Sequence, residues 1–127
     1  MDKYWTFRVY IAKRGEDEFS KWLDNLPKKA RAKIVRTLKY LEVTQYWERP
    51  SFSKLTGYKD LYEIRVKHNN NEYRPIGCYG PGRGDFTILI CAIEKGDKFI
   101  PREAPQIAVR RSKLINEPKH TAEFIDS

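Results

Sequence analysis

The sequence predicts an α+β fold in which a mainly antiparallel sheet carries a pair of helices on one face. Three observations lead to this expectation. Several short runs alternate apolar and polar residues, as half-buried strands do. Two consecutive segments in the first half repeat their apolar residues at helical spacing. A strongly apolar run in the second half suits a central strand. The predicted order of elements is β-α-α-β-β-β-α.

The first three elements are a strand and two helices. Residues 4–12 alternate apolar and polar side chains and predict the strand. The acidic run at residues 16–18 suits the first turn of a helix, where it complements the helix dipole. Pro27 separates this helix from a second one, expected over residues 28–45.

Residues 54–79 form the predicted centre of the fold, a hairpin that turns at residues 68–72. The turn contains three consecutive asparagines, which tolerate left-handed backbone. The polar face of the hairpin is expected to carry Glu63, Arg65, Lys67 and Arg74. Unpaired arginines on a sheet face make a poor core and a good phosphate-binding surface. Pro75 cannot donate a ladder hydrogen bond, so we expect a bulge or a sheet edge there.

The remaining chain supplies a loop, a turn, a strand and a helix. A loop is expected at residues 46–53 and a glycine-rich turn at residues 80–85. Residues 86–93 predict the central strand, and residues 103–114 predict the last helix. We expect residues 1–115 to form one domain and residues 116–127 to be a flexible tail, because the latter lack a periodic pattern.

The charge of the 127-residue chain is strongly basic, with a formal net charge of +8. Residues 1–53 and residues 54–113 each carry +5, and residues 114–127 carry −2. A basic domain suggests a polyanion or an acidic partner, although a merely soluble basic surface is the plain alternative. The N-terminal apolar run is short and interrupted by Arg8, so we expect a cytoplasmic protein with no membrane contact.

The recognised catalytic motifs are absent from the sequence. There is no phosphate loop, GxSxG, CxxC or HExxH. His68 and His120 stand apart from Cys78 and Cys91, so we expect neither a metal nor a small-molecule cofactor. The two cysteines lie in apolar runs, which suits buried thiols without requiring a disulfide.

Cations are the remaining candidates for a functional site. The second predicted helix carries six of them with no acidic residue over residues 28–39, among them Lys33 and Arg36. They predict either a solvated helix face or a contact to an RNA backbone or acidic partner. A second set, which we expect chain order to bring together, consists of Arg65, Arg74, Lys95, Lys98 and Arg102. Alternatively, these are surface charges paired with nearby acidic residues, which adds little stability.

Three consecutive motifs carry a family resemblance. The run LYEIRV…EYRPIGCY, the apolar strand FTILICAI and the segment EKGDKFIPREAPQIAVRR resemble the RelE/ParE toxin superfamily. The similarity is greatest to its HigB-like, phage-derived branch and covers about residues 4–115. It implies a RelE-like fold and a toxin of a type II toxin–antitoxin system, neutralised by a cognate antitoxin. RelE and HigB members cleave mRNA in the ribosomal A site, whereas ParE members poison DNA gyrase.

The resemblance also implies roles for particular residues. The phosphate-binding arginines of RelE-type members fall on Arg65 and Arg74, and the basic segment after the last strand falls on Lys95 and Lys98. In metal-independent cleavage the RNA 2′-hydroxyl attacks the adjacent phosphate, which requires a base, an acid and cations. Glu63 is our candidate base, since it stands where a lysine is frequent. Lys33, Arg36, Lys67 and Arg102 are the expected RNA-binding residues.

Three departures from the family pattern leave alternatives open. Glu63 replaces a lysine, no tyrosine follows Tyr79, and Gly96 stands where an arginine follows the last strand, unless that arginine is displaced to Arg102. The first hypothesis is a ribosome-dependent mRNA endonuclease. The second is a ParE-type gyrase inhibitor, and the third is a non-enzymatic module that binds RNA or a protein partner.

Overall fold

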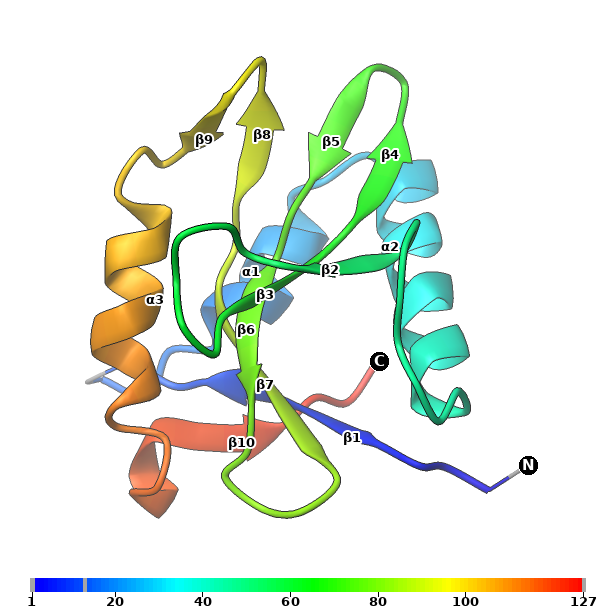
Figure 1. Ribbon diagram of the computed structural model, residues 1–127. Coiled ribbons are helices and arrows are strands. Elements are labelled where there is room, and N and C mark those ends of the chain that lie inside the picture. The colour runs from blue at the N-terminus through cyan, green and yellow to red at the C-terminus, as the bar shows by residue number, and fades with distance from the viewer. Residues whose placement is uncertain (1, 13, 127) are drawn as a thin grey trace.

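The computed structural model describes residues 2–12 and 14–126, so Met1, Lys13 and Ser127 lie outside the described residues. In chain order the elements are β1 (Thr6–Tyr10), α1 (Glu18–Asp24), α2 (Lys28–Glu42), β2 (Phe52–Lys54), β3 (Tyr62–Ile64), β4 (Val66–His68), β5 (Asn71–Tyr73), β6 (Ile76–Tyr79), β7 (Asp85–Ile90), β8 (Ile93–Lys95), β9 (Lys98–Ile100), α3 (Ala104–Ser112), the 3₁₀ turn η1 (Pro118–His120) and β10 (Thr121–Glu123). The predicted α+β class with mostly antiparallel strands is confirmed (Figure 1).

The larger sheet within the described residues has six strands in the order β10-β1-β7-β6-β3-β2. Its neighbours are antiparallel except β1 and β7, which are parallel. The expectation of a central strand at residues 86–93 is confirmed for β7, whose residues from Phe86 to Ile90 are all buried. The expected strand is interrupted, because β7 ends at Ile90 and β8 begins at Ile93 in a second sheet.

Helices cover both faces of the larger sheet, as Figure 1 shows with α3 on the left and α2 on the right. Helices α1 and α2 bury Phe19, Leu23 and Ile34 in one core with Phe7 and Phe86 of the sheet. The predicted helical pair on one face is therefore confirmed. Helix α3 buries Ala104 and Ala108 in a second core on the opposite face.

Local chemistry explains where the helices begin. Asp17 caps α1, because its carboxylate accepts a hydrogen bond from the Ser20 backbone N–H at 3.0 Å. Pro27 precedes the first residue of α2, where its fixed φ and missing N–H cost nothing. Helix α2 ends at Glu42, three residues before the predicted end at Gln45.

The predicted hairpin is divided between the two sheets. Strands β3 and β6 pair in the larger sheet, and β4 and β5 pair in a four-stranded sheet of order β4-β5-β8-β9. Asn69 and Asn70 form the turn with φ of 49° and 65°, as the asparagine run predicts. The division occurs at Pro75, and a register shift between Ile76 and Gly77 supplies the expected bulge.

Gly77 lies in β6 where the strand packs tightly against β7. A Cβ atom on this residue would collide with the Thr87 backbone oxygen and the Phe86 ring. The absence of a side chain therefore allows the two central strands to pair directly after the bulge.

Two expectations from the sequence differ from the structure. Residues 46–53 were expected to form only a loop, but β2 begins at Phe52 and pairs with β3. Residues 116–127 were expected to be a flexible tail, but β10 pairs with β1 and His120 is buried against Tyr10. A three-residue strand is too short to show a periodic pattern, so the sequence alone did not reveal either strand. No helix in the described parts of the chain is both long and apolar enough to cross a membrane.

Candidate functional site

The polar face of the hairpin gathers charged side chains from four strands, β3, β4, β5 and β8. Residues separated by two positions share a face, and the pairings Lys67↔Glu72 and Glu72↔Glu94 align β4, β5 and β8. We define the hairpin face by Glu63, Arg65, Lys67, Glu72, Arg74 and Glu94. It is the side of the sheet facing away from α1 and α2, since Val66 and Tyr73 on the other side are buried in the core that contains these helices.

Arg74 lies inside this face and is paired with three carboxylates. Its Nη2 lies 2.8 Å from Glu72 Oε1, and its Nε lies 3.3 Å from Glu94 Oε1 and 3.7 Å from Glu63 Oε2. Only 2% of the residue is exposed. The expectation of unpaired arginines on this face was wrong, because the register of β5 with β8 brings acidic residues to Arg74 from both sides.

Glu63 connects the two arginines of the hairpin face. Its Oε1 accepts a hydrogen bond from Arg65 Nη1 at 3.0 Å. Its Oε2 and Arg74 Nε are buried without a hydrogen-bond partner among residues 2–12 and 14–126. Burial raises the pKa of the Glu63 carboxyl group above its ordinary value, and the charges of Arg65 and Arg74 only partly oppose this rise. A raised pKa makes the Glu63 carboxylate a stronger base than an ordinary glutamate.

A groove of about 330 Å³ opens beside the exposed part of the hairpin face. We call it the hairpin groove; its lining consists of Lys33, Pro50, Ser51, Arg65, Lys67, Glu72 and Arg74. Lys33 reaches it from α2 and donates a hydrogen bond to the Lys67 backbone oxygen. Three predicted RNA-binding or catalytic cations, Lys33, Arg65 and Lys67, therefore come together at an accessible surface.

Lys95, Lys98 and Arg102 do not join this group. Lys95 and Lys98 are exposed cross-strand partners in the β8–β9 hairpin. Lys95 follows Glu94 directly, so strand alternation directs it to the opposite face from Arg74. Arg102 is exposed in the turn before α3. The expectation that chain order would collect these cations with Arg65 and Arg74 was wrong, because it did not take the alternation of β8 into account.

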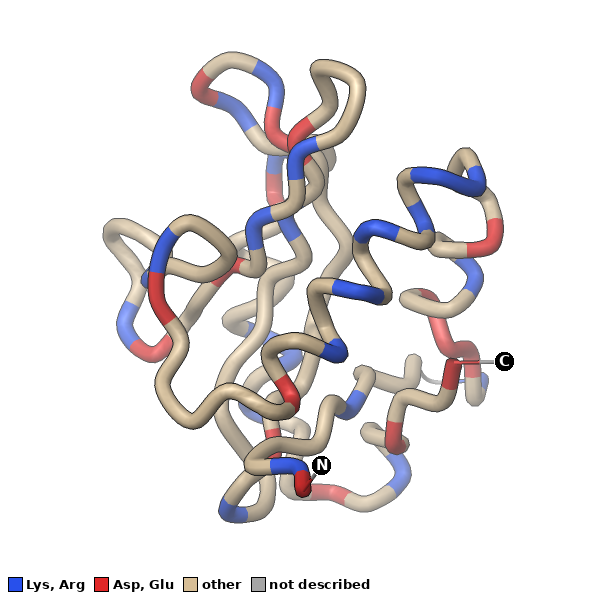
Figure 2. Tube along the Cα trace, turned by 90° about the vertical axis from the view of Figure 1, so that its right-hand side faces the viewer, with Lys and Arg blue, Asp and Glu red and all other residues tan. Residues whose placement is uncertain are grey.

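Helix α2 carries a stripe of exposed cations, and Figure 2 views the molecule from this side. Lys29, Lys33 and Arg36 are spaced by four and three residues and lie on one face of the helix. Within the described chain no carboxylate pairs with them. By contrast, Arg31 Nη2 lies 3.1 Å from Asp126 Oδ1, and Lys39 Nζ lies 4.0 Å from Asp126 Oδ2. Asp126 therefore offsets part of the positive charge of the helix, which the sequence did not suggest. Lys29, Lys33 and Arg36, which we call the α2 stripe, remain positively charged.

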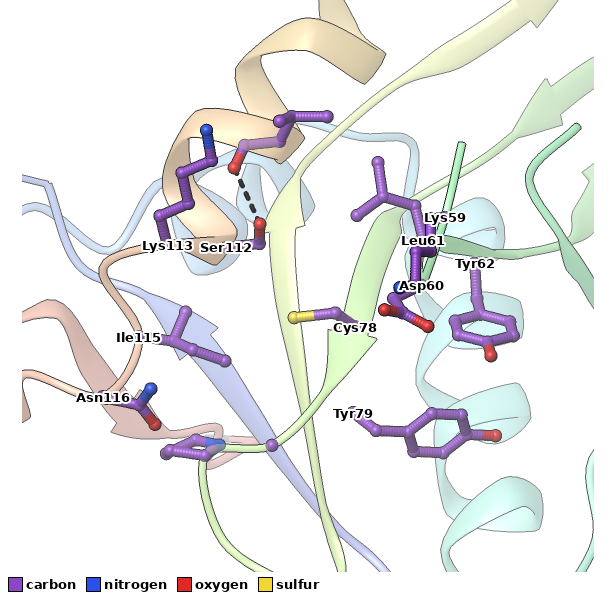
Figure 3. A pocket seen from close by; sticks show the side chains of 13 residues that line it. Lys59, Asp60, Leu61, Tyr62, Cys78, Tyr79, Ser112, Lys113, Ile115 and Asn116 are labelled. Atoms are coloured by element: carbon purple, nitrogen blue, oxygen red, sulfur yellow. Dashed lines mark hydrogen bonds between the residues drawn. The ribbon is translucent and has the colours of Figure 1, made fainter. Parts of the chain in front are cut away.

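A separate cavity of about 530 Å³ lies between the C-terminal end of α3 and the loop before β3 (Figure 3). Cys78 points into it, with Lys59, Asp60 and Lys113 around the lining. Burial raises the pKa of the Cys78 thiol to about 11, so this thiol stays protonated and is a poor nucleophile at neutral pH. The cavity is distinct from the hairpin groove, which none of these residues lines.

Comparisons with known proteins agree with this architecture. The family model described as "Phage derived protein Gp49-like (DUF891)" matches residues 21–113. A solved structure of the E. coli toxin RelE, a mutant in the free state, superposes with a TM-score of 0.55 and 18% sequence identity. The alignment covers 87% of this chain and 98% of the RelE chain, so the two share a fold. No curated protein matches the sequence.

Proposed function

Since the chain belongs to the phage-derived Gp49-like family and has a RelE-like fold, we propose that it is the toxin of a type II toxin–antitoxin system that cleaves mRNA on the ribosome. A cognate antitoxin protein is its expected partner. The observation that carries the proposal is the hairpin groove, which Lys33, Arg65 and Lys67 line and where Arg65 also pairs with the Glu63 carboxyl group at 3.0 Å.

Arg65 is the phosphate-binding residue in this proposal. Its side chain is 25% exposed, and a guanidinium group binds phosphate oxygens in a bidentate manner. Arg74 is enclosed by carboxylates, so it acts as a positioning residue that holds Glu63 and Glu72 in place. This assignment replaces the direct catalytic role that the resemblance implied for Arg74.

Glu63 acts as the base. When the Arg65 guanidinium binds a phosphate oxygen, it no longer donates its hydrogen bond to the Glu63 carboxylate. The freed carboxylate then accepts the proton of the RNA 2′-hydroxyl. The 2′ oxygen then bonds to phosphorus, the bond to the 5′ oxygen breaks, and the products are a cyclic phosphate and a 5′-hydroxyl. Lys67, on the same face, supplies the proton to the leaving oxygen, while Lys95 or Lys98 would have to reach it from the opposite face.

Primer extension on a defined mRNA in a reconstituted translation system tests the proposal. Wild-type protein should produce cuts within codons that require ribosomes, and Arg65→Ala should abolish them while the protein remains folded by circular dichroism. Lys119→Ala removes an exposed cation far along the chain from the groove and should cut like the wild type. Uncut mRNA with folded wild-type protein would contradict the proposal.

A gyrase inhibitor of the ParE type is the second candidate. It is favoured by the enclosure of Arg74, because three carboxylates against two guanidinium groups leave this part of the hairpin face without excess positive charge. Such a protein would block gyrase supercoiling by binding. The same variants distinguish the candidates, since Arg65→Ala should then leave supercoiling inhibition largely intact.

A further inference from the structure

Aromatic side chains surround a second cavity of about 530 Å³, at the end of α2 opposite the hairpin groove. We call it the aromatic cup and define it by Tyr4, Trp5, Tyr46, Trp47, Tyr79 and Arg83. Tyr46 is 81% exposed and Tyr4 is 55% exposed. Large exposed aromatic rings that cluster in this way indicate an interaction site. In the sequence, the only signal of this site is the adjacent pair Tyr46 and Trp47 in the loop before β2.

The inner rings of the aromatic cup are held in fixed orientations. The Trp5 ring centroid lies 5.1 Å from those of both Trp47 and Tyr79. Trp5 Nε1 donates to the Gln45 backbone oxygen at 3.1 Å, and Trp47 Nε1 donates to that of Leu41 at 2.8 Å. The rings therefore lose little further freedom when a flat ligand stacks on them.

The lining of the cup points to a nucleobase more than to a protein side chain. Besides the six defining residues, only Gln45 and Gly84 line it in the described structure, so it contains no aliphatic side chain. Grooves that dock amphipathic helices are lined by aliphatic as well as aromatic groups. Aromatic rings beside an arginine are the arrangement with which proteins hold single-stranded nucleic acids.

A short stretch of chain connects the cup to the hairpin groove. Trp47 lines the cup, and Pro50 and Ser51 line the groove. Four residues at roughly 3.5 Å each span at most about 14 Å, a distance that a few nucleotides bridge. Arg36, in the α2 stripe, lies on the same face of the helix as Lys33 of the groove, and no carboxylate of the described residues pairs with it.

We propose that the aromatic cup stacks an unpaired base of the message strand whose backbone passes the α2 stripe and enters the hairpin groove. This inference rests on the proposed function, because it assumes that the groove takes RNA. Tyr46 closes the outer side of the stack, and Arg83 contacts the adjoining phosphate.

Binding of short oligomers tests the stacking site directly. A fluorescently labelled hexaadenylate should bind the wild type, quench the fluorescence of Trp5 and Trp47, and bind Tyr46→Ala about tenfold more weakly. Tyr46→Phe should restore binding, because a phenyl ring stacks without the hydroxyl group. Ile100→Ala, which removes an exposed apolar side chain on β9, should bind like the wild type.

A hexamer of abasic ribose phosphates separates stacking from charge. It should bind only through the cations and should be insensitive to Tyr46→Ala. The stacking site would be overturned if Tyr46→Ala bound hexaadenylate as tightly as the wild type does. It would also be overturned if the substitution weakened the binding of both oligomers equally. Either result would favour a cup that docks protein. If ribosome-dependent cleavage by the wild type persists in that case, only the cup assignment fails. Base-dependent binding without mRNA cleavage would instead support the stacking site and contradict the proposed endonuclease activity.

Discussion

The hairpin face and the α2 stripe use cations in opposite ways. Arg74 on the hairpin face is buried among Glu63, Glu72 and Glu94, so its positive charge is neutralised by carboxylates inside the protein. Lys29 and Arg36 on the α2 stripe are exposed, and no carboxylate of the described chain pairs with them. The comparison teaches that the charge of a residue does not predict its role, because burial and neighbouring carboxylates decide whether the charge stabilises the fold or faces a ligand.

The largest effect should come from breaking the buried cluster. Arg74→Ala leaves the Glu63 carboxylate and the partly buried Glu94 without their shared cation, and we expect a loss of about 3–5 kcal/mol in the free energy of unfolding. Urea titration followed by circular dichroism measures it. Arg65→Ala is the matched variant, since Arg65 is more exposed and, among the residues that the structure describes, forms an ion pair with Glu63 alone; it should cost about 1 kcal/mol. Equal losses in both variants would contradict a structural role specific to Arg74.

A smaller effect should follow from the titration of Glu63. Its folded-state pKa lies above the ordinary value of 4.5, so the folded protein binds this proton more tightly than the unfolded chain. The contribution of Glu63 to stability is therefore greatest below pH 4.5, decreases as the pH rises to the folded-state pKa, and stays lower above it.

Comparison with Glu63→Gln isolates this contribution from the other carboxyl groups. Urea midpoints measured from below pH 4.5 to neutrality should show the wild type losing stability relative to Glu63→Gln as the pH rises. A relative gain with rising pH would mean that the arginines dominate over burial and that the pKa of Glu63 is lowered.

The smallest change in stability should come from the α2 stripe. The combined variant Lys29→Gln and Arg36→Gln should alter the free energy of unfolding by no more than about 0.5 kcal/mol, because both side chains are exposed. Its effect should appear in RNA binding, where the slope of log affinity against log salt concentration should fall by about 0.7 for each contact removed. An unchanged slope would mean that the stripe is a solvated helix face.

Local patterns were sufficient for the helices and for the central strand. The predicted helical pair, the central β7 and the asparagine turn at Asn69 and Asn70 all correspond to elements of the structure. Each is specified by neighbouring residues through periodicity, capping or left-handed backbone tolerance. Strands β2 and β10 were missed because three-residue strands carry no such pattern and depend on their partners.

By itself, the sequence determined the α+β class, the basic character of α2 and the hairpin centred on residues 54–79, since these follow from interactions between residues close in the chain. Only the tertiary structure decided the partners of Arg74, the separation of Lys95 and Lys98 from the hairpin face, and the joining of Trp5, Trp47 and Tyr79 into one cup. The physical reason is that these contacts join residues far apart in the sequence, and the register of the paired strands decides which side chains meet. A one-residue shift of β8 that paired Lys95 with Glu72 would exchange Glu94 for a lysine beside Arg74.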